Sequence, residues 1–216
     1  MIRTATKKIG NRDDGAGADV QIRVCTFGGL NVYFNNSPVS IIWESQKARL
    51  LFCCLLVTFD QWVHRQTVIE ALWPGCSPAS GEKNFKTTLS RLRKSFSGPR
   101  ITNPVLTQGE AVRLNNLAIT LDASEFRNHS TQGIKLLVRG EVKSARKTLE
   151  AAQDLYRGPF LPEEPNNQFI TAARAELCDL YASVIKALEK SYLLEGNSDA
   201  LEVLSFLKNG PLREPS

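Results

Sequence analysis

Cationic and hydroxyl side chains between residues 83 and 94 form the part of this sequence with the clearest chemistry. Stepping about 100° per residue, as in an α-helix, sorts this stretch into two faces. One face is apolar and carries Phe85, Leu89, Leu92 and Phe96. The opposite face and its flanks carry cations and small hydroxyls, at Lys83, Lys86, Thr87, Ser90, Arg91, Arg93 and Lys94. The spacing predicts a helix that buries its apolar face and exposes a basic one.

A basic helix face of this kind has two interpretations. Lysine and arginine neutralise phosphates, arginine can pair with both acceptors of a guanine, and serine and threonine fit against base edges. The alternative is a solvated basic surface, which is the more common use of such a pattern in an isolated helix. Double-stranded DNA is therefore the candidate partner, and the surrounding sequence indicates whether other elements support DNA binding.

Other residues at expected helix starts add candidate phosphate contacts. Arg65 begins one predicted helix, and Ser45 and Lys47 lie at the start of another. Helix N-termini present free N–H groups that bind phosphate, although ordinary capping explains Ser45 equally well. In a predicted hairpin, Arg113 is placed to reach a groove, whereas Glu110 near the tip would repel phosphate.

The elements expected to position these residues follow one another from residue 20. Short alternating runs predict a small antiparallel sheet, and three helices and a hairpin follow it. The predicted strands are Val20–Phe27, Leu30–Phe34 and Val39–Ile41, the helices are Gln46–Thr58, Arg65–Leu72 and Ser77–Phe96, and the hairpin spans Val105–Leu114. A unit of three helices with a hairpin beside them is a known DNA-reading arrangement, in which one helix enters the major groove.

From Asp122 onward the periodicity is helical throughout. Helix pairs joined by short glycine turns predict an all-α, tetratricopeptide-like stack. The chain is therefore divided into a flexible N-terminal arm (residues 1–19), an α+β module (20–121) and a helical module (122–216).

The charge distribution supports two modules with different partners. Residues 20–121 hold eleven lysines and arginines against five carboxylates, whereas residues 122–216 hold twelve against fourteen. The longest apolar run, Leu50–Val57, is far shorter than the ~20 residues that span a bilayer. We therefore expect no membrane association and a cytoplasmic location.

Enzymatic and metal-dependent functions are not indicated. The five cysteines include no C-x-x-C spacing, and neither of the two histidines lies beside a cysteine pair. A disulfide framework and a zinc site are thus not expected, and the thiols are predicted to be reduced and mostly buried. No nucleophile–base pair or phosphate loop can be assembled. We expect no cofactor and no catalytic activity.

Several segments, taken in order, resemble the antibiotic-regulatory-protein (SARP) type of bacterial transcriptional activator. The resemblance covers about residues 20–216, and the ordered set is specific although no single motif is decisive. The segments in the first module are Val24–Leu30, Lys47–Leu51, Glu70–Pro74 and Leu89–Lys94. Leu121–Phe126, Leu155–Leu161 and Pro211–Glu214 resemble the bacterial transcriptional activation domain that follows it in this family.

The resemblance implies a DNA-binding winged helix with recognition helix Pro78–Phe96, joined to a helical domain used for self-association and activation. By this resemblance, we expect the protein to bind tandem repeats near a promoter as a homodimer and to contact RNA polymerase. By match to the family's helix, Arg91 is expected to read a base, with Lys83, Thr87, Ser90 and Lys94 beside it. Lys86 and Arg93 are expected to contact phosphate.

This chain departs from the family pattern in the predicted hairpin and after the last matching motif. Ala111 and Val112 stand where the family has Gly-Tyr in the hairpin, so wing contacts to DNA are expected to be weaker. Relatives continue with further helices after Pro211–Glu214, so the activation domain is expected to be incomplete. The alternative function is a protein-interaction adaptor with weak or lost DNA binding.

Overall fold

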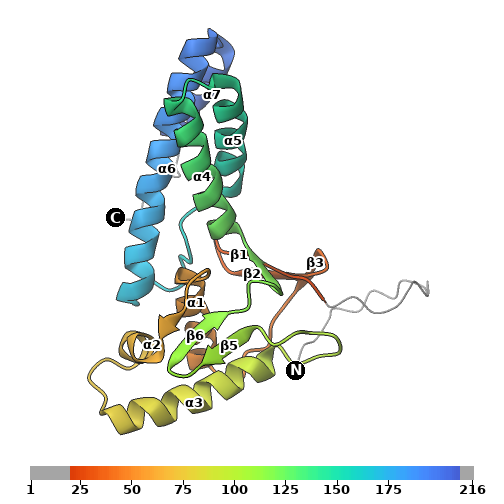
Figure 1. Ribbon diagram of the computed structural model, residues 1–216, viewed down its shortest axis with the longest axis vertical. Helices are drawn as coiled ribbons and strands as arrows, with labels where there is room; N and C mark the ends of the chain where they lie inside the picture. The colour runs from red at the N-terminus through yellow and green to blue at the C-terminus, as the bar shows by residue number, and fades with distance from the viewer. Residues whose placement is uncertain (1–19, 210–216) are drawn as a thin grey trace, which may run out of the picture. The chain divides into compact units, whose positions relative to one another are not determined.

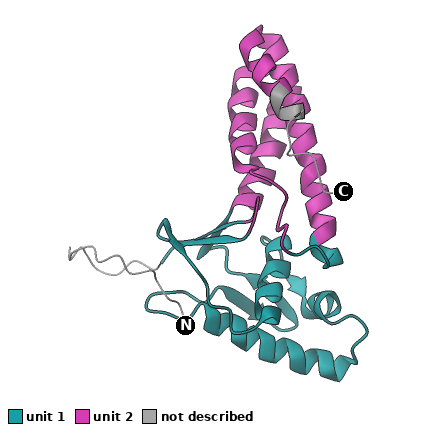
Figure 2. Cartoon of the chain, turned by 180° about the vertical axis from the view of Figure 1, so that it is seen from behind, with its two compact units in different colours: residues 1–25, 30–121, 164–170 teal, residues 26–29, 122–163, 171–216 magenta. Residues whose placement is uncertain are grey.

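The computed structural model describes residues 20–209, which form two compact units (Figure 2). Within these residues the first unit contains 20–25, 30–121 and 164–170, and the second contains 26–29, 122–163 and 171–209. The division is thus not purely sequential, since each unit takes a short segment from the other's part of the chain. The predicted arm at residues 1–19, and residues 210–216 on which the expected truncation rests, lie outside the described part of the chain.

The first unit is of the α+β class. Its elements in order are β1 (Ile22–Cys25), β2 (Asn31–Phe34), β3 (Ser37–Val39), α1 (Gln46–Val57), β4 (Val63–His64), α2 (Arg65–Leu72), α3 (Pro78–Ser95), β5 (Val105–Gln108), β6 (Ala111–Leu114) and β7 (Ile119–Leu121) (Figure 1). Three helices followed by a hairpin is the element order of a winged helix.

The strands form two small sheets. The predicted antiparallel meander β1–β2–β3 is present, but β7 extends it by pairing parallel to β1, with Val24 opposite Leu121. The sheet is therefore mixed and four-stranded, and the expectation of a purely antiparallel sheet was wrong. A three-residue strand such as β7 offers too little alternation to be recognised in the sequence. In the second sheet, the two-residue strand β4 pairs with the β5–β6 hairpin, with Val63 opposite Val112.

Local capping explains where the helices of this unit begin. The Ser45 hydroxyl accepts a hydrogen bond from the backbone N–H of Ala48 at 3.1 Å and caps α1. Ser77 caps α3 by accepting from the N–H of Ser80, and Pro78 occupies the first helical position. Both starts agree with the sequence prediction.

Helices α2 and α3 approach closely at Gly81. A Cβ atom at this position would lie 2.6 Å from the Cγ2 atom of Ile69, a distance that real Cβ atoms do not tolerate. The absence of a side chain at Gly81 therefore allows the two helices to pack directly.

The apolar face of α3 lies in the core, as its spacing predicts. Phe85, Leu89, Leu92 and Phe96 are all buried. The Phe96 ring centroid lies 5.0 Å from that of Phe52 on α1. Burial of this face fixes the rotation of α3, so that its opposite face points to solvent.

The second unit is helical. It contains α4 (Asp122–Val138), α5 (Val142–Leu155), most of α6 (Gln168–Glu195) and α7 (Ser198–Asn209). Helices α4 and α5 lie side by side as an antiparallel pair (Figure 1). A Cβ on Gly133 would lie 2.6 Å from Cγ of Leu149, so glycine is required at this crossing too.

The segment Thr26–Gly29, which follows β1, belongs to the helical unit. The carbonyl of Thr26 accepts from the N–H of Leu161, and the N–H of Gly28 donates to the carbonyl of Pro159, both at 3.0 Å. The Phe27 ring packs edge-on against Phe126 with centroids 5.3 Å apart. The helical unit therefore needs a segment from the N-terminal part of the chain to complete its core.

Candidate nucleic-acid interface

One face of α3 exposes polar and cationic side chains along the length of the helix. Its predicted contact residues that are exposed are Lys83, Lys86, Thr87, Ser90, Arg91 and Lys94. Among the described residues, Lys83, Lys86 and Arg91 have no ion-pair partner. Three unpaired cations on one helix make this face electrostatically attractive to a polyanion.

The two hydroxyls on this face differ in their local bonding. Thr87 donates its hydroxyl hydrogen to the carbonyl of Lys83 at 3.0 Å, which leaves the hydroxyl oxygen able to accept from a partner. The side chain of Ser90 is exposed. Both side chains are short, so a partner that reaches them must approach the helix backbone closely.

At the C-terminal end of α3, two of the predicted contacts have partners within the unit. The Nζ atom of Lys94 lies 3.1 Å from a carboxylate oxygen of Glu44. Arg93 is half-buried and donates to the carbonyl of Val105 at 3.2 Å and to the hydroxyl of Thr107 at 3.4 Å. Arg93 thereby ties α3 to the β5–β6 hairpin.

Arg65, at the start of α2, lies in a cluster of charged side chains. Its guanidinium lies 2.8 Å from Glu82 and 3.0 Å from Glu110, and Nε2 of His64 lies 2.9 Å from the other oxygen of Glu110. The hydrogen bond from His64, followed by the charge of Arg65, lowers the pKa of Glu110 below its usual value. Glu110 is thus ionised at neutral pH and partly neutralises the cations beside it.

The remaining predicted phosphate contacts also have intramolecular partners. Ser45 is the α1 cap described above. Lys47 donates to the carbonyl of Leu72 at 2.8 Å, and its Nζ lies 5.8 Å from the centroid of Trp73. The guanidinium of Arg113 lies over the half-exposed Trp62 ring at 4.7 Å. These three side chains therefore make intramolecular contacts that stabilise the first unit.

Asn84 lies on the exposed face of α3 but was not singled out in the sequence. Asn84 is neither a cation nor a hydroxyl, the two side-chain types that define the predicted contact face. The signal that identifies it is angular, because it falls about 20° from Arg91 around the helix.

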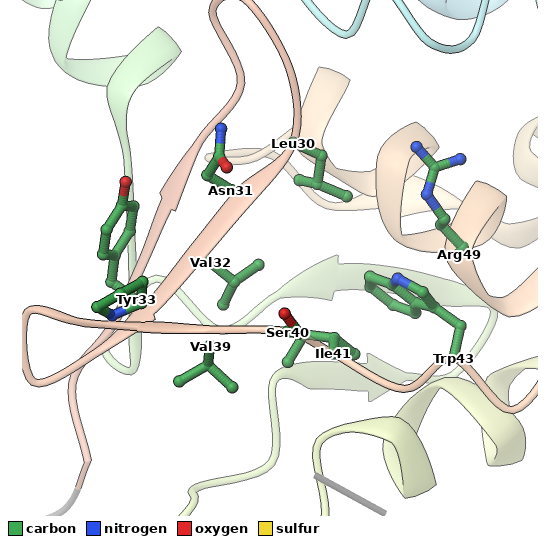
Figure 3. Close-up of a pocket in the computed structure, with 10 residues that line it drawn as sticks. Leu30, Asn31, Val32, Tyr33, Val39, Ser40, Ile41, Trp43 and Arg49 are labelled. Atoms are coloured by element: carbon green, nitrogen blue, oxygen red, sulfur yellow. The ribbon is translucent and has the colours of Figure 1, made fainter. Parts of the chain in front are cut away.

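A separate hollow of about 470 Å³ lies in the first unit, beside β2 and β3 (Figure 3). Its lining residues are Leu30, Asn31, Val32, Tyr33, Pro38, Val39, Ser40, Ile41, Trp43 and Arg49. None of the predicted DNA contacts lines it. The hollow and the basic face of α3 are therefore different features of the unit.

Other kinds of site are not evident in the part of the chain that the structure describes. Residues 20–209 contain no group of three or more histidine, cysteine or carboxylate side chains that could hold a metal ion. The cysteines of the described residues form no disulfide, and burial raises the pKa of Cys54 to about 12, so this thiol is unreactive at neutral pH. Within the same residues, every helix is too short or too polar to cross a lipid bilayer.

Two kinds of known sequence are similar to this chain. Residues 121–216 match the family model of the bacterial transcriptional activator domain. The transcriptional regulatory protein EmbR of Mycobacterium tuberculosis, and likewise that of Mycobacterium bovis, is 26% identical over 196 residues. This alignment covers 87% of the present chain and 49% of EmbR, so the chain spans about half the length of these relatives.

The fold is also that of EmbR. The solved structure of M. tuberculosis EmbR in complex with a low-affinity phosphopeptide superposes with a TM-score of 0.70 at 21% identity. The superposition covers 88% of this chain and 51% of that one. The activator-domain match over residues 121–216 and the similarity to EmbR support the resemblance of this chain to SARP-type bacterial transcriptional activators.

Proposed function

We propose that this protein regulates transcription by binding double-stranded DNA through the exposed face of α3. The observation that carries the proposal is that Lys83, Lys86 and Arg91 are exposed on one helix face and form no ion pair among the described residues. Surface lysines and arginines that have no structural duty remain available for phosphates and base edges.

The roles within this face follow from side-chain chemistry. Arg91 is the base-reading residue, because its guanidinium can donate to both O6 and N7 of guanine. Lys83, Thr87 and Ser90 lie close enough in sequence and angle to contact neighbouring bases. Lys86, on the flank, contacts a phosphate and sets the position of the helix in the groove.

The remaining predicted contacts are secondary in this proposal. They are Ser45, Lys47, Arg65, Arg93, Lys94 and Arg113. Each has an intramolecular partner that a phosphate or base would have to share or displace. We therefore expect each to contribute less to DNA affinity than the unpaired cations.

The second unit is proposed to be a tetratricopeptide-like module that contacts RNA polymerase and supports dimers on tandem DNA repeats. The support is the match to the bacterial transcriptional activator domain and the antiparallel pairing of α4 with α5. Stacked helix pairs of this kind present extended surfaces that bind other proteins.

The test begins with selection of bound duplexes from a random pool, followed by mobility-shift titrations of the full chain. Arg91→Ala is expected to cost about 1–3 kcal/mol of binding free energy and to relax sequence preference at one base pair. Lys86→Ala is expected to weaken binding to all sequences and to reduce the salt slope by about 1. Lys186→Ala, which removes an exposed lysine from α6 of the helical unit, is the matched control.

Two outcomes would contradict the proposal. Recovery of no common motif by the wild-type protein would favour the adaptor alternative. Equal affinity of wild type and Arg91→Ala on the selected site would show that α3 does not read the bases.

A further inference from the structure

We infer that Asn84 is a further base-reading residue of α3 and that it selects an adenine. This inference rests on the proposed function of α3 and adds a specific base and position to it. The argument uses the exposure of Asn84, its lack of intramolecular bonds and its alignment with Arg91.

The side chain of Asn84 is exposed on α3. Phe85 at the next position is buried, and Glu82 on the preceding side lies 2.8 Å from Arg65. Among the described residues, the side-chain amide of Asn84 has no hydrogen-bond partner. Asparagine has a poor intrinsic preference for helix interiors, so its place in the middle of α3 is not explained by helix stability.

The chemistry of the amide matches one base in particular. Its carbonyl oxygen can accept from the N6 amino group of adenine while its NH₂ donates to N7. Guanine offers two acceptors, cytosine one donor and thymine one acceptor in the major groove, so none of these three bases satisfies both ends of a carboxamide in this way. Asn84 is the only asparagine or glutamine in α3, so it alone on this helix can make this contact.

The position of Asn84 relative to Arg91 predicts the spacing of the two bases. Seven residues separate them, which corresponds to about 10 Å along the helix axis and about 20° around it. Both side chains therefore point into the same groove when the helix lies along it. With successive base pairs about 3.4 Å apart along the duplex, the adenine and the guanine are expected about two or three base pairs apart.

Charge around Asn84 favours this use. Lys83 and Lys86 lie one residue before and two residues after it, and neither is neutralised by a carboxylate among the described residues. Lys86 contacts the phosphate backbone beside the helix, whereas the uncharged amide of Asn84 supplies discrimination without adding to non-specific affinity.

The experiment is selection from a random duplex pool with the full-length wild type, Asn84→Ala, Arg91→Ala and Asn128→Ala. Asn128 is an exposed asparagine on α4, so its replacement controls for the same change in helix propensity outside the first unit. Wild type and Asn128→Ala should recover a motif with an adenine and a guanine two or three base pairs apart. Asn84→Ala should lose the preference for adenine alone, and Arg91→Ala should lose the preference for guanine alone.

A modified base gives a second readout that does not depend on selection. Replacing the adenine by 7-deazaadenine removes the N7 acceptor and should weaken wild-type binding about tenfold. The same replacement should leave the affinity of Asn84→Ala unchanged. Circular dichroism and thermal melting of the variant exclude misfolding as the cause.

The outcomes separate this inference from the proposed function. If Arg91→Ala alters the recovered motif but Asn84→Ala recovers the wild-type one, α3 reads DNA and the role of Asn84 is wrong. If 7-deazaadenine weakens wild type and Asn84→Ala equally, the inference also fails. Failure of the wild type to recover any motif would overturn the proposed function, and this inference with it.

Discussion

The hydroxyl of Thr26 donates a 2.6 Å hydrogen bond to Oδ1 of Asp122, a residue 96 positions further along the chain. Oδ2 of the same carboxylate accepts from the backbone N–H groups of Thr26 at 2.8 Å and Phe27 at 3.1 Å. Oδ1 also accepts from the N–H of Ala123 at 2.7 Å, at the start of α4. One buried carboxylate thus attaches the segment after β1 to the first turn of the helical unit.

Replacing Asp122 by alanine should destabilise the helical unit strongly. The substitution leaves the Thr26 hydroxyl and three backbone N–H groups without their acceptor in a buried environment, and each such group carries a desolvation cost. We expect a loss of about 3 kcal/mol or more in the free energy of unfolding, measured by urea denaturation with circular dichroism. Glu202→Ala, at an exposed position of α7, should have little effect.

A result within about 0.5 kcal/mol of wild type would contradict this assignment. It would mean that water or another side chain satisfies the four donors once the carboxylate is gone.

The ionisation of Asp122 should also give the helical unit a recognisable dependence on pH. Burial raises the pKa of Asp122 above its ordinary value, although the hydrogen bonds from Thr26, Phe27 and Ala123 oppose this shift. Because the folded protein takes up the proton at a higher pH than the unfolded chain does, acidification favours folding at this site. The contribution is complete below the ordinary pKa of 3.8 and is lost as pH rises through the raised one.

The comparison between wild type and Asp122→Asn isolates this effect from the other carboxylates. Their difference in unfolding free energy should shift in favour of wild type as the pH falls from 7 towards 4. A shift in favour of Asp122→Asn over that interval would show that the hydrogen bonds outweigh burial and that the pKa of Asp122 is lowered.

Features that depend on neighbouring residues could be predicted from the sequence, whereas features that join distant residues, such as the bonds between Thr26 and Asp122, could not. The starts of α1 and α3 were predictable, because Ser45, Ser77 and Pro78 act on backbone groups within one helical turn. The pairing of β1 with β7 could not be predicted, because it joins residues far apart in the chain. For the same reason, the sequence did not show that residues 26–29 belong to the second unit and residues 164–170 to the first.

The same distinction holds for the candidate site. The exposure of Lys83 and Arg91 follows from helical periodicity, which is a local property. The partners of Lys94 and Arg65 come from Glu44 and Glu110, which lie 50 and 45 residues away. Only the folded chain shows which cations are already paired.

Gly81→Ala should destabilise the first unit through the crossing of α2 and α3. The added Cβ would meet Cγ2 of Ile69 at 2.6 Å and Sγ of Cys76 at 3.1 Å, so that the helices must move apart. The gain in helix propensity is smaller than the cost of overpacking, and a net loss of about 1–2 kcal/mol in unfolding free energy is expected. Ser80→Ala, at the preceding exposed position, lacks this conflict and serves as the control.

Combining Gly81→Ala with Ile69→Ala should cost less than the sum of the two single changes. The smaller side chain at position 69 removes the Cγ2 atom that the new methyl would strike, which makes the two positions coupled. Additive losses would mean that the close approach at Gly81 is not what makes glycine necessary.

Glu110→Gln should increase affinity for duplex DNA of any sequence. Its carboxylate is exposed and lies 3.0 Å from the Arg65 guanidinium and 2.9 Å from His64. Neutralising it removes a repulsive charge from the hairpin and leaves Arg65 with Glu82 as its remaining acidic partner. We expect a roughly twofold to fivefold gain in a mobility-shift titration at low salt, diminishing as salt is raised.

Glu202→Gln makes the same change in net charge on α7 of the helical unit and should leave the affinity unchanged. An equal gain in both variants would show that net charge alone governs binding, and a loss in Glu110→Gln would mean that the cluster around Arg65 must stay intact for the protein to bind DNA.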